Sequence, residues 1–251
     1  SGEYNLITVT KQGLSDRRIF SIGLDNMSTN AENFDHPGTY VNNAIARRNG
    51  SFGLTYNANP GGVSFSTTSP SIMYHTFEPA ALRKGLNGTT ATHTAVPNSL
   101  GGHIIGDNRT GSIGGNDQGF VGHIGEVIIY GNDTITAAER NKVETYLAIK
   151  YGITLHNANN YTTSQDAIIW DAIANVDFYN NLAGIGNDFL SAQHQKQSRS
   201  QHANTNDQVI IGLGDIAETN IANTNSLNHG QFLVWGDNNN TQAMTNATST
   251  Y

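Results

Sequence analysis

The chain reads FVGHIGEVIIYGNDTITAAERNKVETYLAIKYGITL from Phe120 to Leu155, and this stretch joins a strand, a turn and one capped helix. Its first part is predicted to be a strand, because apolar residues recur among glycine and polar ones. The apolar positions are Val121, Ile124, Val127 and Ile129. We expect this strand to pack on one face and to be fully buried near its end.

A helix is predicted to follow, with a start and a stop that both have a physical reason. Thr136 and Glu139 form a T-x-x-E capping box, which satisfies two free main-chain donors at a helix start. Gly152 stands where a left-handed C-terminal cap is expected, so the helix should end near Tyr151.

The faces of this helix are predicted from residue spacing. Arg140 and Glu144 are four residues apart and are expected on the solvated side as an ion pair. The other face is predicted to carry Val143, Tyr146, Leu147 and Lys150.

Further strands are predicted on both sides of this stretch, separated by Asn- and Gly-rich connections. Asn87-Gly88 is a hairpin signal. Leu6, Val9, Ile19 and Ile22 are expected to point inward. The strands before Phe120 are predicted at 4–10, 17–24, 40–46, 51–56, 72–77, 82–86 and 103–106. Those after Leu155 are predicted at 167–170, 182–185, 208–213 and 232–235.

The composition favours an all-β protein with many turns. Hydrophobic residues make up 37% of the 251 residues and charged residues only 13%, and Asn outnumbers the 27 Gly. Asn and Gly suit tight turns and left-handed positions. The chain is long enough for one large β domain or two smaller ones.

Charge and cysteine content exclude several classes of function. The net charge of -7 argues against a nucleic-acid partner, because such binding depends on clustered Lys and Arg. The lack of cysteine removes disulfides, thiolate catalysis and cysteine-based zinc sites. No apolar run approaches the length of a membrane span, so membrane insertion is not expected.

The segment from Phe120 to Leu155 resembles the closing strand and signature helix of concanavalin A-like, laminin G-like sandwiches in large bacterial surface proteins. The resemblance is particularly to Bacteroidota adhesins exported by the type IX route. The motifs GIGND, QKQSRS, VIIGLGD and FLVWGDN, between Gly184 and Asp237, resemble the module that often follows such a sandwich.

This resemblance implies two domains: a laminin G-like β-sandwich with one C-terminal helix over residues 1–155, and a small β-rich module over 156–251. Similar sandwiches have strands before Tyr4, and the similar module normally continues past FLVWGDN. We therefore expect the sandwich to lack its first strands and the module to be truncated at its C-terminus, as part of a longer parent chain. An extracellular, cell-surface location also follows from the resemblance.

No catalytic residue is predicted. A glycosidase needs two carboxylates that flank one bond, whereas Glu126 stands alone on its strand. His194 and His202 flank a polar stretch and are expected to be loop positions, with a zinc pair as the weaker reading. Gly212, Gly214 and Ala217 match a loose dinucleotide fingerprint, but no helix is predicted after them.

Calcium is the metal that the sequence best supports. Hard cations bind the oxygens of Asp and Asn side chains and of the main chain, which turns at a sandwich rim can supply. Two clusters are candidates, although Asx residues beside glycine also form ordinary turns. They are Asp25, Asn26, Glu32 and Asp35, and Asp107, Asn108, Asn116 and Asp117.

The predicted function is a non-enzymatic, ligand-binding or adhesive part of a secreted bacterial surface protein. Glycans or proteins and peptides are the predicted ligands, and secretion or attachment machinery is a further partner. A sugar site would need an aromatic face, for which Tyr40, Tyr56, Tyr74 and Phe77 are candidates, although these also suit the core. The alternatives are a structural spacer or secretion cargo region of a stalk, and a degenerate polysaccharide hydrolase.

Overall fold

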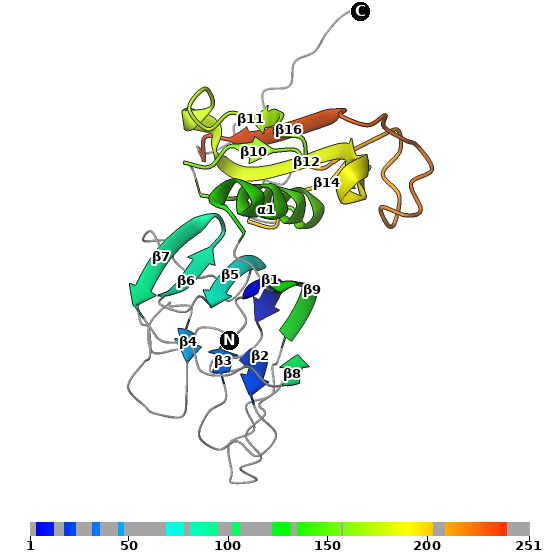
Figure 1. Cartoon of the computed structure of the whole chain (residues 1–251). Helices are drawn as coiled ribbons and strands as arrows, with labels where there is room; N and C mark the ends of the chain where they lie inside the picture. Colours follow the sequence, from blue (N-terminus) through cyan, green and yellow to red (C-terminus); the bar gives the residue numbers. More distant parts are fainter. Residues whose placement is uncertain are drawn as a thin grey trace, which may run out of the picture. The chain divides into compact units, whose positions relative to one another are not determined.

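The computed structural model in Figure 1 shows two units, which are described separately. The units are Ser1–Ala148 and Ile149–Tyr251, so the division falls within one helix. The structure describes residues 4–12, 18–23, 32–35, 45–47, 69–77, 81–94, 102–105, 122–131, 135–156, 158–202 and 209–239.

The first unit contains two antiparallel sheets, with strand orders β7-β6-β5-β1-β9 and β4-β3-β2-β8. Their strands are β1 Tyr4–Gln12, β2 Arg18–Gly23, β3 Glu32–Asp35, β4 Ile45–Arg47, β5 Ser71–Phe77, β6 Ala81–Leu86, β7 Thr89–Thr94, β8 Gly102–Ile105 and β9 Gly122–Gly131. The predicted fold class is confirmed: the protein is an all-β sandwich with one α-helix among the described residues, followed by a β-rich module.

Most of the predicted strands of this unit are confirmed. They correspond to β1, β2, β5, β6 and β8. The prediction over 40–46 overlaps β4 at its C-terminal end, and the prediction over 51–56 lies outside the described residues. β7, of sequence TTATHT, was missed because it has no large apolar residue and so no hydrophobic alternation.

Strand β1 is an interior strand of the larger sheet, and its residues 5–10 are buried on both faces. It pairs with β5 on one side and with β9 on the other, so that Ile7 lies opposite both Tyr74 and Ile128. Leu6 and Val9 are buried, as predicted. Ile19 and Ile22 belong to β2, where the structure describes the main chain alone.

Strand β9 is present where it was predicted, but the expected full burial near its end is wrong. Ile129 is 45% exposed and Tyr130 is 38% exposed. β9 lies at the edge of its sheet and has β1 as its neighbour on one side only. An edge strand keeps less of its side-chain surface covered than a central one, which accounts for the difference.

The Asn87-Gly88 hairpin between β6 and β7 is confirmed. Asn87 has a φ of 46° and Gly88 a φ of 89°, which are the positive values that a type I′ turn requires. Asn87 also ties the turn to β5, because its Oδ1 accepts from the Ile72 N–H at 2.8 Å and its own N–H donates to the Ile72 carbonyl at 2.9 Å.

Helix α1 spans Ala137–Tyr151 and has the predicted ends. The Thr136 N–H donates to Glu139 Oε2 at 2.7 Å, and the Glu139 N–H donates to Thr136 Oγ1 at 3.2 Å, which completes the capping box. Hydrogen bonds from the main chain and the hydroxyl of Thr136 lower the pKa of Glu139. Gly152 has a φ of +63° and caps the C-terminus.

The predicted solvated face of α1 is wrong. Glu144 is 1% exposed and shares the buried side of the helix with Leu147 and Ala148. These positions are separated by three and four residues and therefore lie on one stripe. Arg140, one turn earlier, keeps only 14% of its side chain exposed.

The second unit is built on a three-stranded antiparallel sheet of order β13-β12-β16, with two small two-stranded sheets, β10-β11 and β14-β15. Its strands are β10 Tyr161–Thr162, β11 Ile168–Trp170, β12 Asn180–Asp188, β13 Gln193–Gln195, β14 Gln197–Ser198, β15 Ile211–Gly212 and β16 Phe232–Asp237. Two 3-10 turns complete it, η2 Val176–Phe178 and η3 Phe189–Ser191. Each predicted strand of this part overlaps one of these elements.

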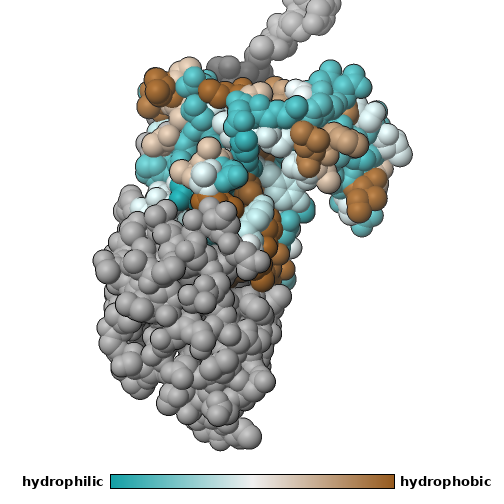
Figure 2. All heavy atoms as spheres, in the orientation of Figure 1, coloured by the Kyte–Doolittle hydropathy of each residue, from teal (hydrophilic) through white to brown (hydrophobic). Residues whose placement is uncertain are grey.

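Across the part of the chain that the structure describes, no helix combines the length and the apolar character needed to cross a bilayer. Figure 2 shows hydrophilic and hydrophobic residues beside one another on the coloured part of the viewed face.

Candidate functional site

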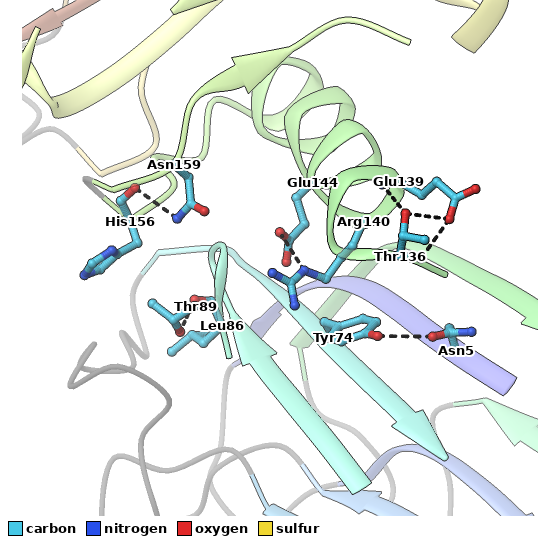
Figure 3. Close-up of polar contacts among 10 residues, drawn as sticks. All are labelled: Asn5, Tyr74, Leu86, Thr89, Thr136, Glu139, Arg140, Glu144, His156 and Asn159. Carbon is cyan, nitrogen blue, oxygen red and sulfur yellow. Dashed lines mark hydrogen bonds and ion pairs between the residues drawn. The ribbon is translucent and has the colours of Figure 1, made fainter. Parts of the chain in front are cut away.

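A buried ion pair lies where α1 meets the larger sheet of the first unit (Figure 3). Arg140 Nε lies 3.4 Å from Glu144 Oε2. The Arg140 guanidinium carbon lies 5.1 Å from the ring centroid of Tyr74 on β5, which is a cation–π distance. The Tyr74 hydroxyl in turn donates to Asn5 Oδ1 on β1 at 3.1 Å. The four side chains thus link the helix to two neighbouring strands.

Burial raises the pKa of Glu144 to about 7, because the ionised carboxylate loses its hydration. Arg140 and the Gly88 N–H oppose this shift but do not cancel it. Neither carboxylate oxygen completes a well-formed hydrogen bond with a described residue. The charge of Glu144 is therefore supported mainly by one guanidinium at a long contact distance.

A carboxyl with a pKa near 7 is a candidate general acid or base. Glu144, however, is 1% exposed and lies between a helix and a sheet, where it cannot meet a substrate. Structural ion pairs also shift pKa values. We conclude that Glu144 and Arg140 position α1 on the sheet.

The glycine motifs of the second unit are explained by close packing. Gly184 and Gly186 lie on one face of β12, where a Cβ would come within 2.7 Å of Ile149 Cδ1 and within 2.0 Å of the Phe232 ring, respectively. On β16, a Cβ at Gly236 would come within 2.3 Å of the Phe178 carbonyl oxygen. The GIGND and FLVWGDN motifs therefore mark positions that have no room for a side chain.

The QKQSRS motif organises the neighbouring segments. The Gln197 side chain donates to the Ala217 carbonyl at 2.7 Å and accepts from the Ala217 N–H at 2.8 Å. The Lys196 ammonium donates to the Asn223 carbonyl. The buried Asn223 amide donates to the Leu213 carbonyl at 3.1 Å. These contacts hold the Gly212–Asp215 turn, and no helix follows it, so a dinucleotide site is not formed there.

Asp188, at the end of β12, is a buried carboxylate with satisfied oxygens. It accepts from the N–H and the hydroxyl of Ser164, each at 2.7 Å, and from the Leu190 N–H at 3.2 Å. Burial alone would raise the pKa of Asp188, but these hydrogen bonds outweigh it and lower the pKa below its usual value. Asp188 therefore anchors the turn that contains Ser164.

The four described histidines of the second unit each accept a hydrogen bond from a main-chain N–H. The donor–acceptor pairs are Ala158 to His156 Nδ1 at 3.4 Å, Leu227 to His194 Nε2 at 3.2 Å, Thr154 to His202 Nδ1 at 3.3 Å and Phe189 to His229 Nδ1 at 3.0 Å. His194 and His202 therefore serve as main-chain acceptors. No group of three or more His, Cys, Asp or Glu side chains suited to a metal occurs within the described ranges.

The predicted calcium ligands fall mostly on residues that the structure does not describe. Glu32 and Asp35 are the two ends of β3, whose main chain alone is described. The others lie outside the described residues: Asp25, Asn26, Asp107, Asn108, Asn116 and Asp117.

Among the candidates for a sugar-binding aromatic face, Tyr74 is excluded. It is 2% exposed and is covered by Arg140. Tyr40 and Tyr56 lie outside the described residues, and the side chain of Phe77 is not described.

In comparisons with known proteins, one family model matches the C-terminal part of the chain. A family described as a domain of unknown function, DUF8202, matches residues 139–251, which include most of α1 and the second unit. No curated protein matches the sequence.

Solved structures with a similar chain course include carbohydrate-binding and pentraxin proteins. The CBM40 module of the Ruminococcus gnavus IT-sialidase, bound to α2,3-sialyllactose, is 12% identical over 55% of this chain and 79% of that chain, with a TM-score of 0.44. A SAP-like pentraxin from Limulus polyphemus is 15% identical over 68% of this chain and 80% of that chain, with a TM-score of 0.47.

A mutant of the NanB sialidase from Streptococcus pneumoniae is 13% identical over 55% of this chain and 23% of that chain, with a TM-score of 0.43. All three TM-scores are below 0.5, so these similarities carry no argument about ligand or activity.

Proposed function

We propose that this chain is a non-enzymatic, ligand-binding part of a larger secreted protein at a bacterial cell surface. The proposed organisation is a laminin G-like sandwich over residues 1–155 and a β-rich module over 156–251. The proposed ligands are glycans or peptides, held at segments that connect the strands of the sandwich.

One observation carries this proposal: Glu144, the described carboxyl whose pKa burial raises to about 7, is enclosed between α1 and the sheet and has a structural role. Glu144 is 1% exposed and paired with Arg140. A hydrolase would require a pair of carboxylates open to substrate. Glu126 accepts from the Tyr146 hydroxyl at 3.3 Å, which ties it to α1. A role as a frame for binding segments fits this arrangement better than catalysis does.

The proposal is tested with the full chain on a glycan array and a peptide panel, with calcium and with a chelator. Reproducible binding of one ligand class supports direct recognition. Absence of binding by correctly folded protein contradicts it and leaves the spacer function. Release of reducing sugar that is lost in Glu126→Gln would instead establish a hydrolase.

Calcium binding at the two predicted clusters is part of the same proposal. Ligand binding to the folded state raises its melting temperature, by about 5 °C for this size of protein when calcium is present at about 100 times its dissociation constant. We expect Asp25→Asn with Asp35→Asn to remove one site, and Asp107→Asn with Asp117→Asn the other.

Asp177→Asn is the matched control for these variants, because it removes an exposed carboxylate of the second unit from a 3-10 turn. Calcium titrations of the melting temperature and metal analysis give the readout. A melting temperature that does not respond to calcium in the parent chain would rule out both sites.

A further inference from the structure

The segment Leu227–Gln231, which leads into β16, is held in place by hydrogen bonds to two histidine rings. His194 on β13 accepts from the Leu227 N–H through Nε2 at 3.2 Å. His229, within the segment, accepts from the Phe189 N–H of η3 through Nδ1 at 3.0 Å. Its Nε2 lies 3.0 Å from Gln165 Oε1. Since an oxygen can only accept, Nε2 of His229 carries the proton and Nδ1 is bare.

The other hydrogen bonds that join this segment to β12 are made by amide groups, which do not bind or release a proton in this pH range. Asn187 on β12 donates from its side-chain amide to the Leu227 carbonyl at 2.7 Å and from its N–H to the Gln231 carbonyl at 3.0 Å. The Gly230 N–H donates to the Asn187 carbonyl at 2.8 Å. The segment is therefore held by one amide residue, which is insensitive to pH, and by two rings whose acceptor nitrogens can bind a proton.

Both rings are exposed, so protons reach them from solvent. Among the described residues, the charged side chains in or beside the segments that contact these two histidines include Asp188, Asp166, Lys196 and Glu218. Asp188 already accepts hydrogen bonds from the N–H groups of Ser164 and Leu190, and the Lys196 ammonium donates to the Asn223 carbonyl. Among the residues that the structure describes, no ion pair joins either ring to a charged side chain. A second proton on either ring therefore gains no carboxylate partner in the closed arrangement.

We propose that His194 and His229 form an acid-sensitive clamp on the Leu227–Gln231 segment. A neutral imidazole accepts one hydrogen bond, whereas an imidazolium has an N–H on both nitrogens and accepts none. Protonation places an N–H of each ring against a main-chain N–H, so both contacts break. Histidine is the side chain that undergoes this change between neutral and mildly acidic pH. The Asn187 contacts persist, so the opening is local.

Amide hydrogen exchange of the full chain tests the clamp. From pH 8 to pH 5, after correction for the intrinsic exchange rate, the protection of the Leu227 and Phe189 amides should fall about tenfold, as expected for loss of one hydrogen bond each. The Gly230 amide, which donates to Asn187, is the internal control and should change less than about threefold. Unchanged protection at Leu227 and Phe189 would overturn the proposal.

Two substitutions keep the acceptor and remove the titration. In His194→Gln the amide oxygen takes the place of Nε2, and in His229→Asn it takes the place of Nδ1. The double variant should retain its protection at pH 5. An equal loss of protection in the double variant and the parent chain would show that other groups open the segment.

The tautomers of the two rings give a test that needs no variant. The hydrogen bonds require His229 to carry its proton on Nε2 and His194 to carry its proton on Nδ1 at pH 8. Nitrogen-15 chemical shifts of the rings distinguish these forms. The reverse tautomer at either ring would contradict the clamp.

Discussion

Glu144 Oε2 lies 3.4 Å from Arg140 Nε, and this contact lies on the buried side of α1. The guanidinium also covers Tyr74, so one cation faces both a carboxylate and an aromatic ring. A buried ion pair costs hydration on both partners, and excellent geometry is needed to recover that cost. Here the contact is long, and Arg140 and the Gly88 N–H together do not cancel the effect of burial on the pKa of Glu144, so the pair should make stability depend on pH.

The first prediction concerns this pH dependence. Burial raises the pKa of Glu144 from its ordinary 4.5 to about 7 in the folded chain, so the folded state binds a proton more tightly than the unfolded state. This contribution to stability is fully present below pH 4.5 and is lost as the pH rises through about 7. As the pH rises through this range, the unfolding free energy of the parent chain should fall by up to about 3 kcal/mol relative to that of Glu144→Gln.

Urea denaturation of both proteins at pH 5, 6, 7 and 8 measures this difference. Glu139→Gln is the control, because it changes an exposed carboxyl of the same helix whose pKa is shifted in the opposite direction. A constant difference between the parent chain and Glu144→Gln across this range would show that Glu144 keeps one protonation state.

The second prediction concerns the partner cation. Arg140→Met should cost about 2–4 kcal/mol at pH 8, because it leaves the Glu144 carboxylate buried without its counter-charge. This range is set below that for fully buried pairs because Arg140 keeps 14% of its side chain exposed. The cost should shrink at pH 5, where the carboxyl is protonated. Addition of Glu144→Gln to Arg140→Met should restore most of the loss, and strictly additive effects would argue against the coupling.

The third prediction concerns the Asn87-Gly88 turn. Asn87→Ala should cost about 1–3 kcal/mol, because it leaves the buried Ile72 N–H without its acceptor and places alanine at a positive φ. Asn87→Asp keeps the acceptor oxygen and should cost less. Thermal and urea denaturation give the comparison. Equal costs for the two variants would mean that the Ile72 hydrogen bond contributes little.

The sequence predicted the elements that follow from local signals. The capping box, Gly152 and the Asn87-Gly88 pair each use chemistry that is contained within a few residues, and each occurs as expected. Apolar alternation found β1 and β5 but could not reveal β7, whose threonines carry no such pattern.

Two predictions that depended on which surface covers a residue failed, although the inward direction of Leu6 and Val9 was predicted correctly. A charged pair on a helix is normally solvated, and only the neighbouring strand shows that Arg140 and Glu144 face inward. The stripe of Glu144 with Leu147 and Ala148 was the available signal. In the same way, the exposure of Ile129 depends on the position of β9 at a sheet edge, which is set by strand order. The calcium clusters remain predictions, because their ligands lie on residues whose side chains the structure does not describe.

The last prediction concerns Gly236 of the second unit, which has no room for a side chain. Gly236→Ala should cost about 2–3 kcal/mol, because its Cβ would lie 2.3 Å from the Phe178 carbonyl oxygen and 3.0 Å from the Asn180 carbonyl oxygen. Leu182 Cδ2 would also lie 2.8 Å away, but the two carbonyl oxygens are main-chain atoms, so relief requires movement of the backbone between η2 and β12. Gly131→Ala is the matched control, because nothing lies within 4 Å of its Cβ position, and it should change stability by less than about 0.5 kcal/mol. Equal effects of the two substitutions in urea denaturation would mean that FLVWGDN retains its glycine for a reason other than packing.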